Sequence, residues 1–212
     1  MYVDGFNLYY RLYKNSRRST NLSHYKWLDL RAVGETLIDS CDTLDKIYYC
    51  SAAVINPPWD PDMNNRQRTF WRALRAHCSA EIVEGNFIVT TKNRIPVDTI
   101  NHGNMPVEFN TREEKGTDVN LAALIVRDAF DHRCERAILV SSDSDLALAV
   151  AMTVIDGEVP VHIASPDTRL PTKLQNAAST FSILDDATIK RCQMPSPVIE
   201  DNKRQIFKPK RW

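Results

Sequence analysis

Four aspartates in three separate segments are the residues of this sequence best suited to do chemistry. Asp4 stands in MYVDGFNLYY, Asp118 in EEKGTDVNLAALIVRDAF, and Asp143 and Asp145 in ERAILVSSDSDLALAVAM. Asp4 directly follows residues typical of a buried strand, where an unpaired acid is costly, so it must end that strand or coordinate a ligand. Asp143 follows a continuous apolar run and precedes a helix, which is how a buried parallel strand ends at the carboxyl edge of its sheet.

These carboxylates can meet only if the chain brings their three segments to one edge. In an open parallel sheet, ligands bind outside the carboxyl ends of the strands, and a helix that leads into a strand begins on that side. Asp118 occupies the first turn of such a helix, and Asp4 joins it if the first strand is central and lies next to the strand before Asp143. Taken singly, Asp118 could instead be an acid that stabilises a helix N-terminus, and Asp143 could be a helix cap.

Four clustered acids require a counter-charge, because carboxylates that repel one another take up protons or move apart. A divalent cation removes that conflict. The three motifs offer oxygen ligands and contain neither His nor Cys, which favours Mg²⁺ or Mn²⁺ over zinc. Such an ion polarises a phosphoryl oxygen and activates water. We therefore expect the four acids to be metal ligands and catalytic residues for phosphodiester hydrolysis: Asp4, Asp118, Asp143 and Asp145.

Strands and helices that could position these acids alternate along the chain. We expect strands at 1–3, 45–55, 81–90, 136–142, 159–164 and 181–184, and helices at 7–14, 27–40, 61–78, 117–130, 145–155 and 171–177. Gly85 is expected to break the third strand, and the polar stretch 91–106 to be a hairpin or flexible insertion. Since only three residues precede Asp4, the first strand is short or begins upstream. The alternation predicts an α/β fold with a mostly parallel sheet and helices on both faces.

Length and composition fit one large α/β domain, because the chain has 212 residues of which 43% are hydrophobic. The formal net charge is zero and gives no overall signal for nucleic acid or membrane. The longest uncharged apolar run, 146–155, is too short to cross a bilayer. Five widely spaced cysteines without a C-x-x-C pair indicate a reducing compartment. We therefore expect a cytoplasmic protein with no membrane partner, and its oligomeric state stays open.

Charge is unevenly distributed along the chain. Between residues 113 and 145, eight acids stand against four bases, whereas from residue 190 to the end seven bases face two acids. An acidic segment and a basic tail on one chain suit a metal site beside a polyanion, although basic tails are often plain solvated termini. We expect residues 191–212 to be an extended, basic, Pro-containing tail whose terminal FKPKRW binds nucleic acid or folds back onto the domain.

The three acidic motifs also resemble a known family. YVDGFNLYY, EEKGTDVNLAALIVRDAF and ILVSSDSDLALAV, in that order, are similar to the NYN domains of the DUF88 or LabA-like group in the PIN-like nuclease superfamily. WLDL and RQRTFWRALRAH look like that group's intervening segments, and the resemblance covers roughly residues 1–190. It implies a PIN-like three-layer sandwich and an acidic Mg²⁺ or Mn²⁺ site that cuts RNA. We expect this domain to carry a hairpin insertion near 86–112.

The resemblance assigns roles residue by residue. Asp4 matches the aspartate that ends the first strand, and Asn7 matches the polar residue one helical turn later. Asp118 matches the acid of the K-G-x-D motif. Asp143 and Asp145 match the S-x-D-S-D pair, in which Asp143 is the surer ligand and Asp145 acts directly, through water or on a second ion.

Five further residues are expected to support the site. Asn7 and Ser142 would orient a ligand or water beside the metal. Lys115, Arg66 and Arg68 could contact the RNA backbone, although a loop lysine and helix arginines are as often surface residues without such a role.

The tyrosines at positions 9, 10 and 13 form an aromatic cluster at the start of the chain. They could stack bases, but at this spacing we expect them to belong partly to the core.

Three functions are open on these observations. The leading one is a metal-dependent ribonuclease. Asp-Ser-Asp-Leu after an apolar strand also resembles the D-x-D phosphatase signature of haloacid-dehalogenase-like enzymes, but that signature normally lies on the first strand. The remaining alternative is a non-catalytic RNA-binding or regulatory module of the same fold. The presence of all four acids favours the enzyme.

Overall fold

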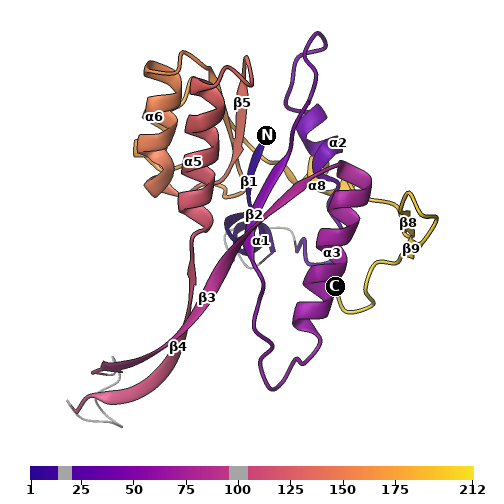
Figure 1. Cartoon of the computed structure of the whole chain (residues 1–212), viewed down its shortest axis with the longest axis vertical. Helices are drawn as coiled ribbons and strands as arrows, with labels where there is room; N and C mark the ends of the chain where they lie inside the picture. Colours follow the sequence, from indigo (N-terminus) through magenta and orange to yellow (C-terminus); the bar gives the residue numbers. More distant parts are fainter. Residues whose placement is uncertain (14–20, 96–104) are drawn as a thin grey trace.

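The computed structural model describes residues 1–13, 21–95 and 105–212, and its centre is a seven-stranded sheet (Figure 1). The strands lie in the order β4-β3-β2-β1-β5-β6-β7. Their bounds are β1 Tyr2–Asp4, β2 Tyr48–Ala52, β3 Glu81–Arg94, β4 Val107–Lys115, β5 Ala137–Val140, β6 Val161–Ser165 and β7 Thr180–Ile183. Neighbouring strands along the part β3-β2-β1-β5-β6-β7 of this order are parallel, whereas β4 is antiparallel to β3. The predicted α/β fold with a mostly parallel sheet is confirmed, and β1 lies next to β5.

Helices cover both faces of the sheet and make a three-layer sandwich. One face carries α1 Gly5–Tyr13, α2 Leu30–Glu35, α3 Met63–Cys78 and α8 Asp186–Arg191, and the other carries α5 Thr117–Phe130, α6 Ala147–Ile155 and α7 Thr172–Ala177. Side chains alternate along β1, so Val3 packs toward α1 and α3 while Tyr2 packs toward α5. Among the described residues, no helix is long and apolar enough to span a bilayer.

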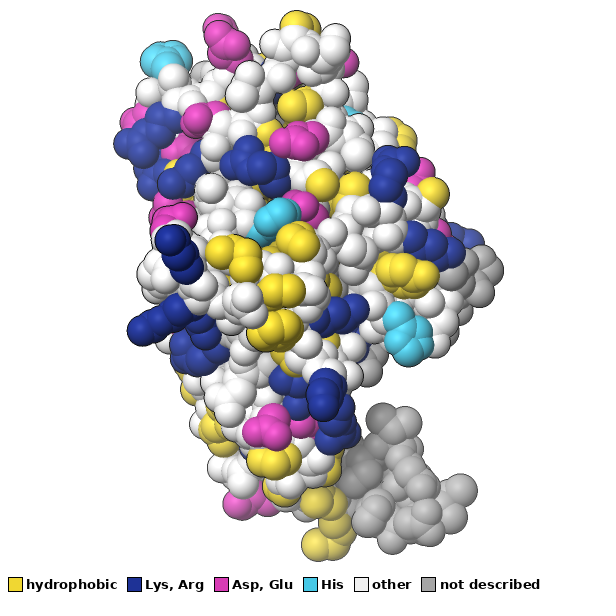
Figure 2. Space-filling view, turned by 90° about the vertical axis from the view of Figure 1, so that its right-hand side faces the viewer, with side chains coloured by type: hydrophobic (Ala, Val, Ile, Leu, Met, Phe, Trp, Pro, Cys, Tyr) yellow, Lys and Arg dark blue, Asp and Glu magenta, His cyan; other side chains and the backbone are white. Residues whose placement is uncertain are grey.

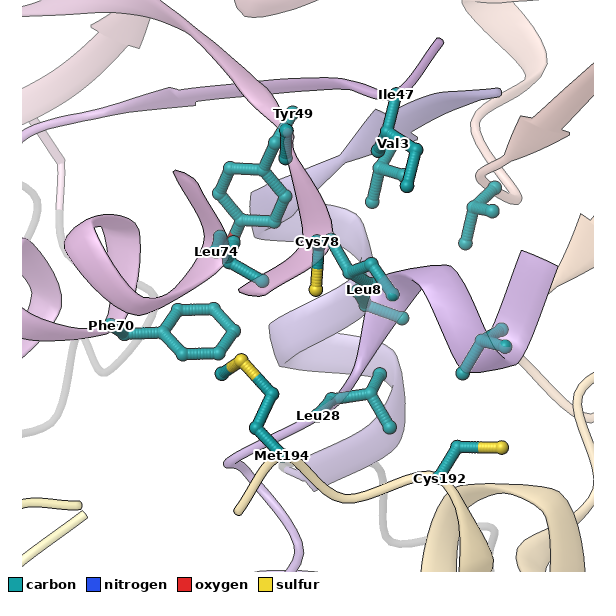
Figure 3. Close-up of a cluster of buried hydrophobic side chains, with 14 of the residues drawn as sticks. Val3, Leu8, Leu28, Ile47, Tyr49, Phe70, Leu74, Cys78, Cys192 and Met194 are labelled. Atoms are coloured by element: carbon teal, nitrogen blue, oxygen red, sulfur yellow. The ribbon is translucent and has the colours of Figure 1, made fainter. Parts of the chain in front are cut away.

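The core on the α1 and α3 side consists of large apolar side chains from the sheet and both helices (Figure 3). Val3 from β1 and Tyr49 from β2 pack against Leu8 of α1 and against Phe70 and Leu74 of α3. Val3 and Leu74 are fully buried. Because both helices rest on the strands beside Asp4, this core fixes the backbone from which the candidate site projects.

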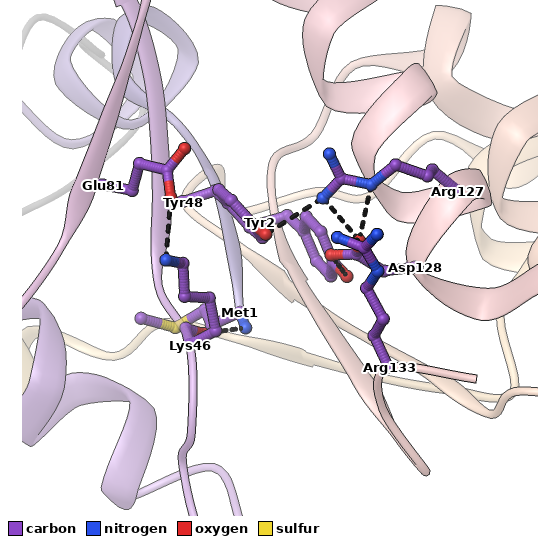
Figure 4. Close-up of polar contacts among 8 residues, drawn as sticks. All are labelled: Met1, Tyr2, Lys46, Tyr48, Glu81, Arg127, Asp128 and Arg133. Carbon is purple, nitrogen blue, oxygen red and sulfur yellow. Dashed lines mark hydrogen bonds and ion pairs between the residues drawn. The ribbon is translucent and has the colours of Figure 1, made fainter. Parts of the chain in front are cut away.

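A polar network at the opposite end of the sheet anchors α5 (Figure 4). The Tyr2 hydroxyl donates to Asp128 Oδ2 at 2.9 Å, and Arg127 Nε donates to Asp128 Oδ1 at 2.8 Å. Arg127 Nη2 also donates to the Tyr48 hydroxyl at 3.0 Å. These contacts tie the C-terminal turn of α5 to the starts of β1 and β2, so its N-terminal turn, with Asp118, faces the carboxyl edge.

The β3 and β4 strands form a long hairpin that extends from the body of the molecule (Figure 1). Its register runs from Asn86 opposite Lys115 to Arg94 opposite Val107. We expected Gly85 to break this strand, but β3 continues through it. A Cβ there would lie 2.8 Å from the Lys115 carbonyl oxygen, so the glycine permits close approach where β4 turns into α5. The tip of the predicted insertion, residues 96–104, lies outside the described residues, as does Lys14 of the predicted first helix.

Helix α2 is shorter than the predicted helix at 27–40. Asp29 caps it, and its side chain accepts a hydrogen bond from the backbone N–H of Ala32 at 3.0 Å. Trp27 and Leu28 precede the cap outside the helix, beside the C-terminal segment, where Leu28 forms an isolated bridge with Gln193 and the Met194 N–H donates to the Trp27 carbonyl at 2.9 Å. Both side chains are buried. Their apolar character therefore reflects burial beside the C-terminal segment and not membership of the helix.

The residues after α8 do not form the extended tail that we expected. They contain an antiparallel pair, β8 Val198–Ile199 and β9 Gln205–Ile206, and they bury Met194 in the same cluster as α3. The ring of Trp212 lies 5.2 Å from that of Phe70, measured between centroids. Apolar side chains within this basic segment are the reason that it folds back.

Gly5, the first residue of α1, is tightly packed, and this packing can be tested by substitution. A Cβ at this position would lie 2.6 Å from Tyr49 Cζ and 2.9 Å from Ser51 Cβ. Gly5→Ala is therefore expected to lower the free energy of unfolding by about 1–3 kcal/mol, measured by denaturant titration. In Gly5→Ala/Tyr49→Leu the loss should be smaller than the sum of the single losses, because the crowded ring is gone. Strictly additive losses would contradict this explanation.

Candidate functional site

The carboxyl edge of the sheet carries the four predicted acids. In the parallel pair of β1 and β5, Val3 lies opposite Val140, so Asp4 stands beside the segment that continues from β5 to Asp143. Asp118 lies in the first turn of α5, after Gly116, which has a φ of 98°. The structure thus brings three segments of the chain to one edge, and electrostatic coupling among their acids follows from this.

Asp4 is buried with only 3% of its surface exposed. Its Oδ1 accepts a hydrogen bond from the Asn7 N–H at 2.9 Å, and its Oδ2 accepts one from the Ser141 hydroxyl at 3.1 Å. The pKa of Asp4 is raised to about 7: burial is the largest cause, the charges of Asp118 and Asp143 add to the rise, and the two hydrogen bonds oppose it. Asp4 is therefore a buried acid that other acids surround.

Asp118 and Asp143 belong to the same electrostatic group. Partial burial raises the pKa of Asp118, and the charges of Asp143, Glu114 and Asp145 add to the shift. Asp143 Oδ1 accepts a hydrogen bond from the Asp145 N–H at 2.9 Å, which caps the short 3₁₀ helix η1 Ser144–Leu146. Asp143 therefore caps η1, as its position in the sequence allowed. Its charge also contributes to the raised pKa values of Asp4 and Asp118.

Asn7 and Ser142, the two predicted supporting residues, contact each other. Asn7 Oδ1 accepts hydrogen bonds from the Ser142 N–H at 3.0 Å and from the Ser142 hydroxyl at 2.9 Å. This pair joins the first turn of α1 to the loop after β5. It therefore holds Asp4 and Asp143, which flank the two contacts in sequence, in a fixed relation.

The donor chemistry of this edge fits a hard divalent cation, since it consists of carboxylate oxygens and the pKa values of Asp4 and Asp118 are raised by burial and by neighbouring acid charges. Within residues 1–13, 21–95 and 105–212, no three carboxylate, imidazole or thiol groups stand together as a ready-made ligand set. The acids are thus coupled through their charges but are not drawn together around a point. An ion here would neutralise the repulsion that now favours a proton on Asp4.

Two further acids near this edge were missed in the sequence. Asp167 follows β6, is 4% exposed, and lies 3.3 Å from Arg11 Nη1 through its Oδ2. Its signal was Ser-Pro-Asp after an apolar strand, the same pattern as Ser-Ser-Asp after β5. Glu114 Oε1 accepts hydrogen bonds from the Thr117 N–H at 3.0 Å and from its hydroxyl at 2.5 Å. Glu114 therefore braces the start of α5 directly beside Asp118.

The three basic residues predicted to contact RNA each have an acidic or amide neighbour. Lys115 Nζ lies 3.3 Å from Glu113 Oε2 at the end of β4. Arg68 Nε donates to Asn64 Oδ1 at 3.0 Å, one helical turn away.

Arg66 makes a two-pronged ion pair with Asp60, in which Arg66 Nη1 donates to Asp60 Oδ1 at 2.9 Å and Nη2 contacts Oδ2. It lies in the wall of a separate cavity rather than among the four acids.

That cavity lies between α1, α3 and the C-terminal segment and has a volume of about 480 Å³. Gly5, the residue after Asp4, forms part of its wall. Eight of its nineteen lining residues are aromatic, namely Phe6, Tyr9, Tyr10, Tyr13, Tyr49, Trp59, Phe70 and Trp212. Figure 2 shows the face of the molecule that carries α3 and the C-terminal segment, over which Lys and Arg side chains are spread.

Comparisons with known proteins identify the family. The chain is 26% identical over its full length to 74% of the Pseudomonas putida (strain DSM 28022 / S16) protein named 6-hydroxy-3-succinoylpyridine 3-monooxygenase HspA. A protein of unknown function from Vibrio parahaemolyticus RIMD 2210633 has a crystal structure that matches 87% of this chain and 91% of its own, with a TM-score of 0.56 and 20% identity, which shows a shared fold. The sequence model of the NYN domain matches residues 1–185. This chain therefore belongs to the NYN domain family and has its nuclease-type fold.

Proposed function

We propose that this protein is a metal-dependent ribonuclease that hydrolyses RNA phosphodiester bonds at the edge formed by Asp4, Asp118, Asp143 and Asp145. The observation that carries the proposal is the burial of Asp4 beside two further acids, which raises its pKa to about 7. Such an arrangement holds a surplus of negative charge that a divalent cation would neutralise. Membership of the NYN domain family supports nuclease-type chemistry.

Asp4, Asp118 and Asp143 would hold Mg²⁺ or Mn²⁺, with Asp145 acting directly, through water or on a second ion. The bound ion would supply polarisation of a phosphoryl oxygen and a lower pKa for the attacking water. Asp118 and Asp143 would have to turn toward Asp4, because their side chains are coupled but not assembled. Asn7 assists by holding the loop after β5 at a fixed distance from Asp4.

The substrate phosphate would be positioned by the start of α5. Lys115 lies two residues before the start of this helix, and its side chain is 58% exposed, so it can reach an anion outside the edge. The helix N-terminus adds a positive potential at the same place. These groups attract a phosphodiester toward Asp118 without neutralising the acids themselves.

A second candidate function acts on a small heteroaromatic ring. Two observations favour it: the aromatic cavity beside Gly5, and the relative whose printed name describes a 3-monooxygenase of 6-hydroxy-3-succinoylpyridine. A monooxygenase places one oxygen atom of O₂ in the product and reduces the other to water with two electrons from an added donor. The acidic edge contributes no obvious step to that reaction, and for this reason the ribonuclease is preferred.

Cleavage of RNA tests the leading proposal. End-labelled single-stranded RNA and DNA of the same sequence are incubated with Mn²⁺, Mg²⁺ or EDTA, and the products are resolved on a gel. We expect metal-dependent cleavage of RNA by the wild type. Asp143→Asn should cleave RNA at least about 100-fold more slowly, because it keeps the oxygen that caps η1 but loses the negative charge that would bind the ion.

Asp156→Asn is the matched control, because Asp156 is an exposed acid after α6 at the opposite edge. It should cleave at the wild-type rate. Cleavage that survives both EDTA and Asp143→Asn would contradict a metal mechanism. Salt-sensitive RNA binding without any cleavage would instead establish the non-catalytic RNA-binding module.

The raised pKa of Asp4 predicts a particular dependence of stability on pH. Its ordinary pKa is 3.8 and its pKa in the fold is about 7, so between these values the folded protein keeps a proton that the unfolded chain has released. Without metal, stability should therefore fall as the pH rises from about 4 to 7 and level off above that. In EDTA at pH 8, Asp4→Asn should be more stable than the wild type by about 2–4 kcal/mol, measured by thermal unfolding.

The difference between Asp4→Asn and the wild type should nearly vanish at pH 4, where both side chains are neutral. At pH 8, Mn²⁺ should stabilise the wild type but have little effect on Asp4→Asn, because the variant has lost an ionised ligand. Parallel pH profiles for the two proteins would show that Asp4 is not the group that titrates.

The second candidate is tested by incubating the protein in air with 6-hydroxy-3-succinoylpyridine and a reduced nicotinamide or flavin donor. Ring-dependent oxidation of the donor, together with a product heavier by one oxygen atom in mass spectrometry, would support it. A substrate recovered unchanged, with cleavage of RNA in the parallel assay, is the result expected from the leading proposal.

A further inference from the structure

The cavity between α1, α3 and the C-terminal segment has a rigid aromatic floor. Tyr49 and Phe70 are buried there, with ring centroids 6.1 Å apart and planes at 82°. Trp212 packs on Phe70, and its indole N–H donates to the Lys26 carbonyl at 2.8 Å. The volume of about 480 Å³ lies within the roughly 300–1,000 Å³ of small-ligand pockets. The floor is thus a preformed surface of suitable size for a planar group.

The rim of the cavity carries two solvent-exposed aromatic rings. Trp59 is 82% exposed and Tyr10 is 54% exposed. Tryptophan side chains are mostly buried in proteins, and an exposed one beside a pocket offers a large flat face at low entropic cost. Phe6 stacks on Tyr10 at 6.3 Å, which keeps that rim ring in place. A planar ligand could therefore lie on the floor and be covered from the rim.

The charged residues of the wall favour an anionic ligand. Lys26, Arg66 and Arg211 are cationic, and Asp60 is the acid that faces them. The Arg66 hydrogen bonds hold the pKa of the Asp60 carboxyl below its usual range, and the charge of Arg211 lowers it further. Asp60 thus fixes the guanidinium of Arg66 without cancelling the positive charge of the wall.

The cavity and the acidic edge share one turn of chain. Gly5 lines the cavity and directly follows Asp4. The Tyr49 hydroxyl lies 2.7 Å from the place where a Gly5 Cβ would be. In the parallel pair of β1 and β2, Asp4 lies opposite Cys50, the residue after Tyr49, and the charge of Asp4 contributes after burial to raising the pKa of Tyr49. The floor of the cavity and the acid at the end of β1 are therefore joined through adjacent residues of one chain segment.

We propose that the aromatic cavity is a nucleobase subsite, in which one base of an RNA strand stacks while the neighbouring phosphodiester group lies at the four acids. The inference rests on the proposed ribonuclease for its substrate. Aromatic stacking accepts every base, because each base has a π-face, and the cations of the wall add attraction for the phosphate attached to it. The wall combines aromatic rings with cationic side chains, and this combination suits a flat, aromatic and anionic ligand.

Calorimetric titration of the full chain with uridine 5′-monophosphate and adenosine 5′-monophosphate in EDTA tests the subsite without cleavage. We expect both nucleotides to bind, and Trp59→Ala and Tyr10→Ala to bind each at least about fivefold more weakly, because each variant removes one stacking face. Phe130→Ala is the matched control, since that ring is 51% exposed at the end of α5 and lies outside the cavity wall.

Absence of nucleotide binding, or binding that neither rim variant weakens, would overturn the subsite. Uracil or 2-hydroxypyridine binding as tightly as the nucleotide would also overturn it, because the occupant would then be a free small ring. Failure of the ribonuclease proposal is a separate result. In that case the nucleotides bind in a Trp59-dependent manner, but RNA stays intact with Mn²⁺ or Mg²⁺.

Discussion

The negative charge of Asp4, buried at the end of the central strand, is the constraint on which the site depends. A carboxylate in this position is disfavoured by burial and by Asp118 and Asp143, and only two hydrogen bonds oppose these effects. A proton or a cation must therefore balance it. The surrounding structure keeps this unfavourable arrangement in place, because β1 is held on both sides by parallel strands and cannot retreat from the edge.

The helix that carries Asp118 is oriented from its far end. Asp128 accepts from Tyr2 and Arg127, and these bonds set α5 against the starts of β1 and β2. At the near end, Glu114 binds the N–H and the hydroxyl of Thr117. Because α5 is restrained at both ends, its first turn faces the carboxyl edge without any contribution from the acids. The acids therefore stay near one another despite their mutual repulsion.

The sequence predicted the parts of this fold that depend on local pattern. Apolar runs that end in acids mark parallel strands at their carboxyl ends, and this places Asp4 beside the segment of Asp143. Local pattern failed where burial came from distant partners. Trp27 and Leu28 were expected in a helix but lie outside it and are buried beside the C-terminal segment, and Met194 lies in a basic stretch that looked solvated. Asp167 was not among the predicted site residues, and its place near the edge depends on the strand order that brings β6 next to β5.

The cavity shows a second limit of sequence reasoning, since its wall combines rings from α1, α3 and residue 212 that share no motif. Its relation to the acidic edge is nevertheless set by one residue. Gly5 must lack a side chain because the Tyr49 ring occupies the space that a Cβ would need, and the same turn leads directly from Asp4 into α1. The floor of the cavity and the buried acid therefore cannot change independently. A larger residue at position 5 would have to displace the Tyr49 ring or shift the first turn of α1, and that turn holds the Asn7 N–H that stabilises the Asp4 carboxylate.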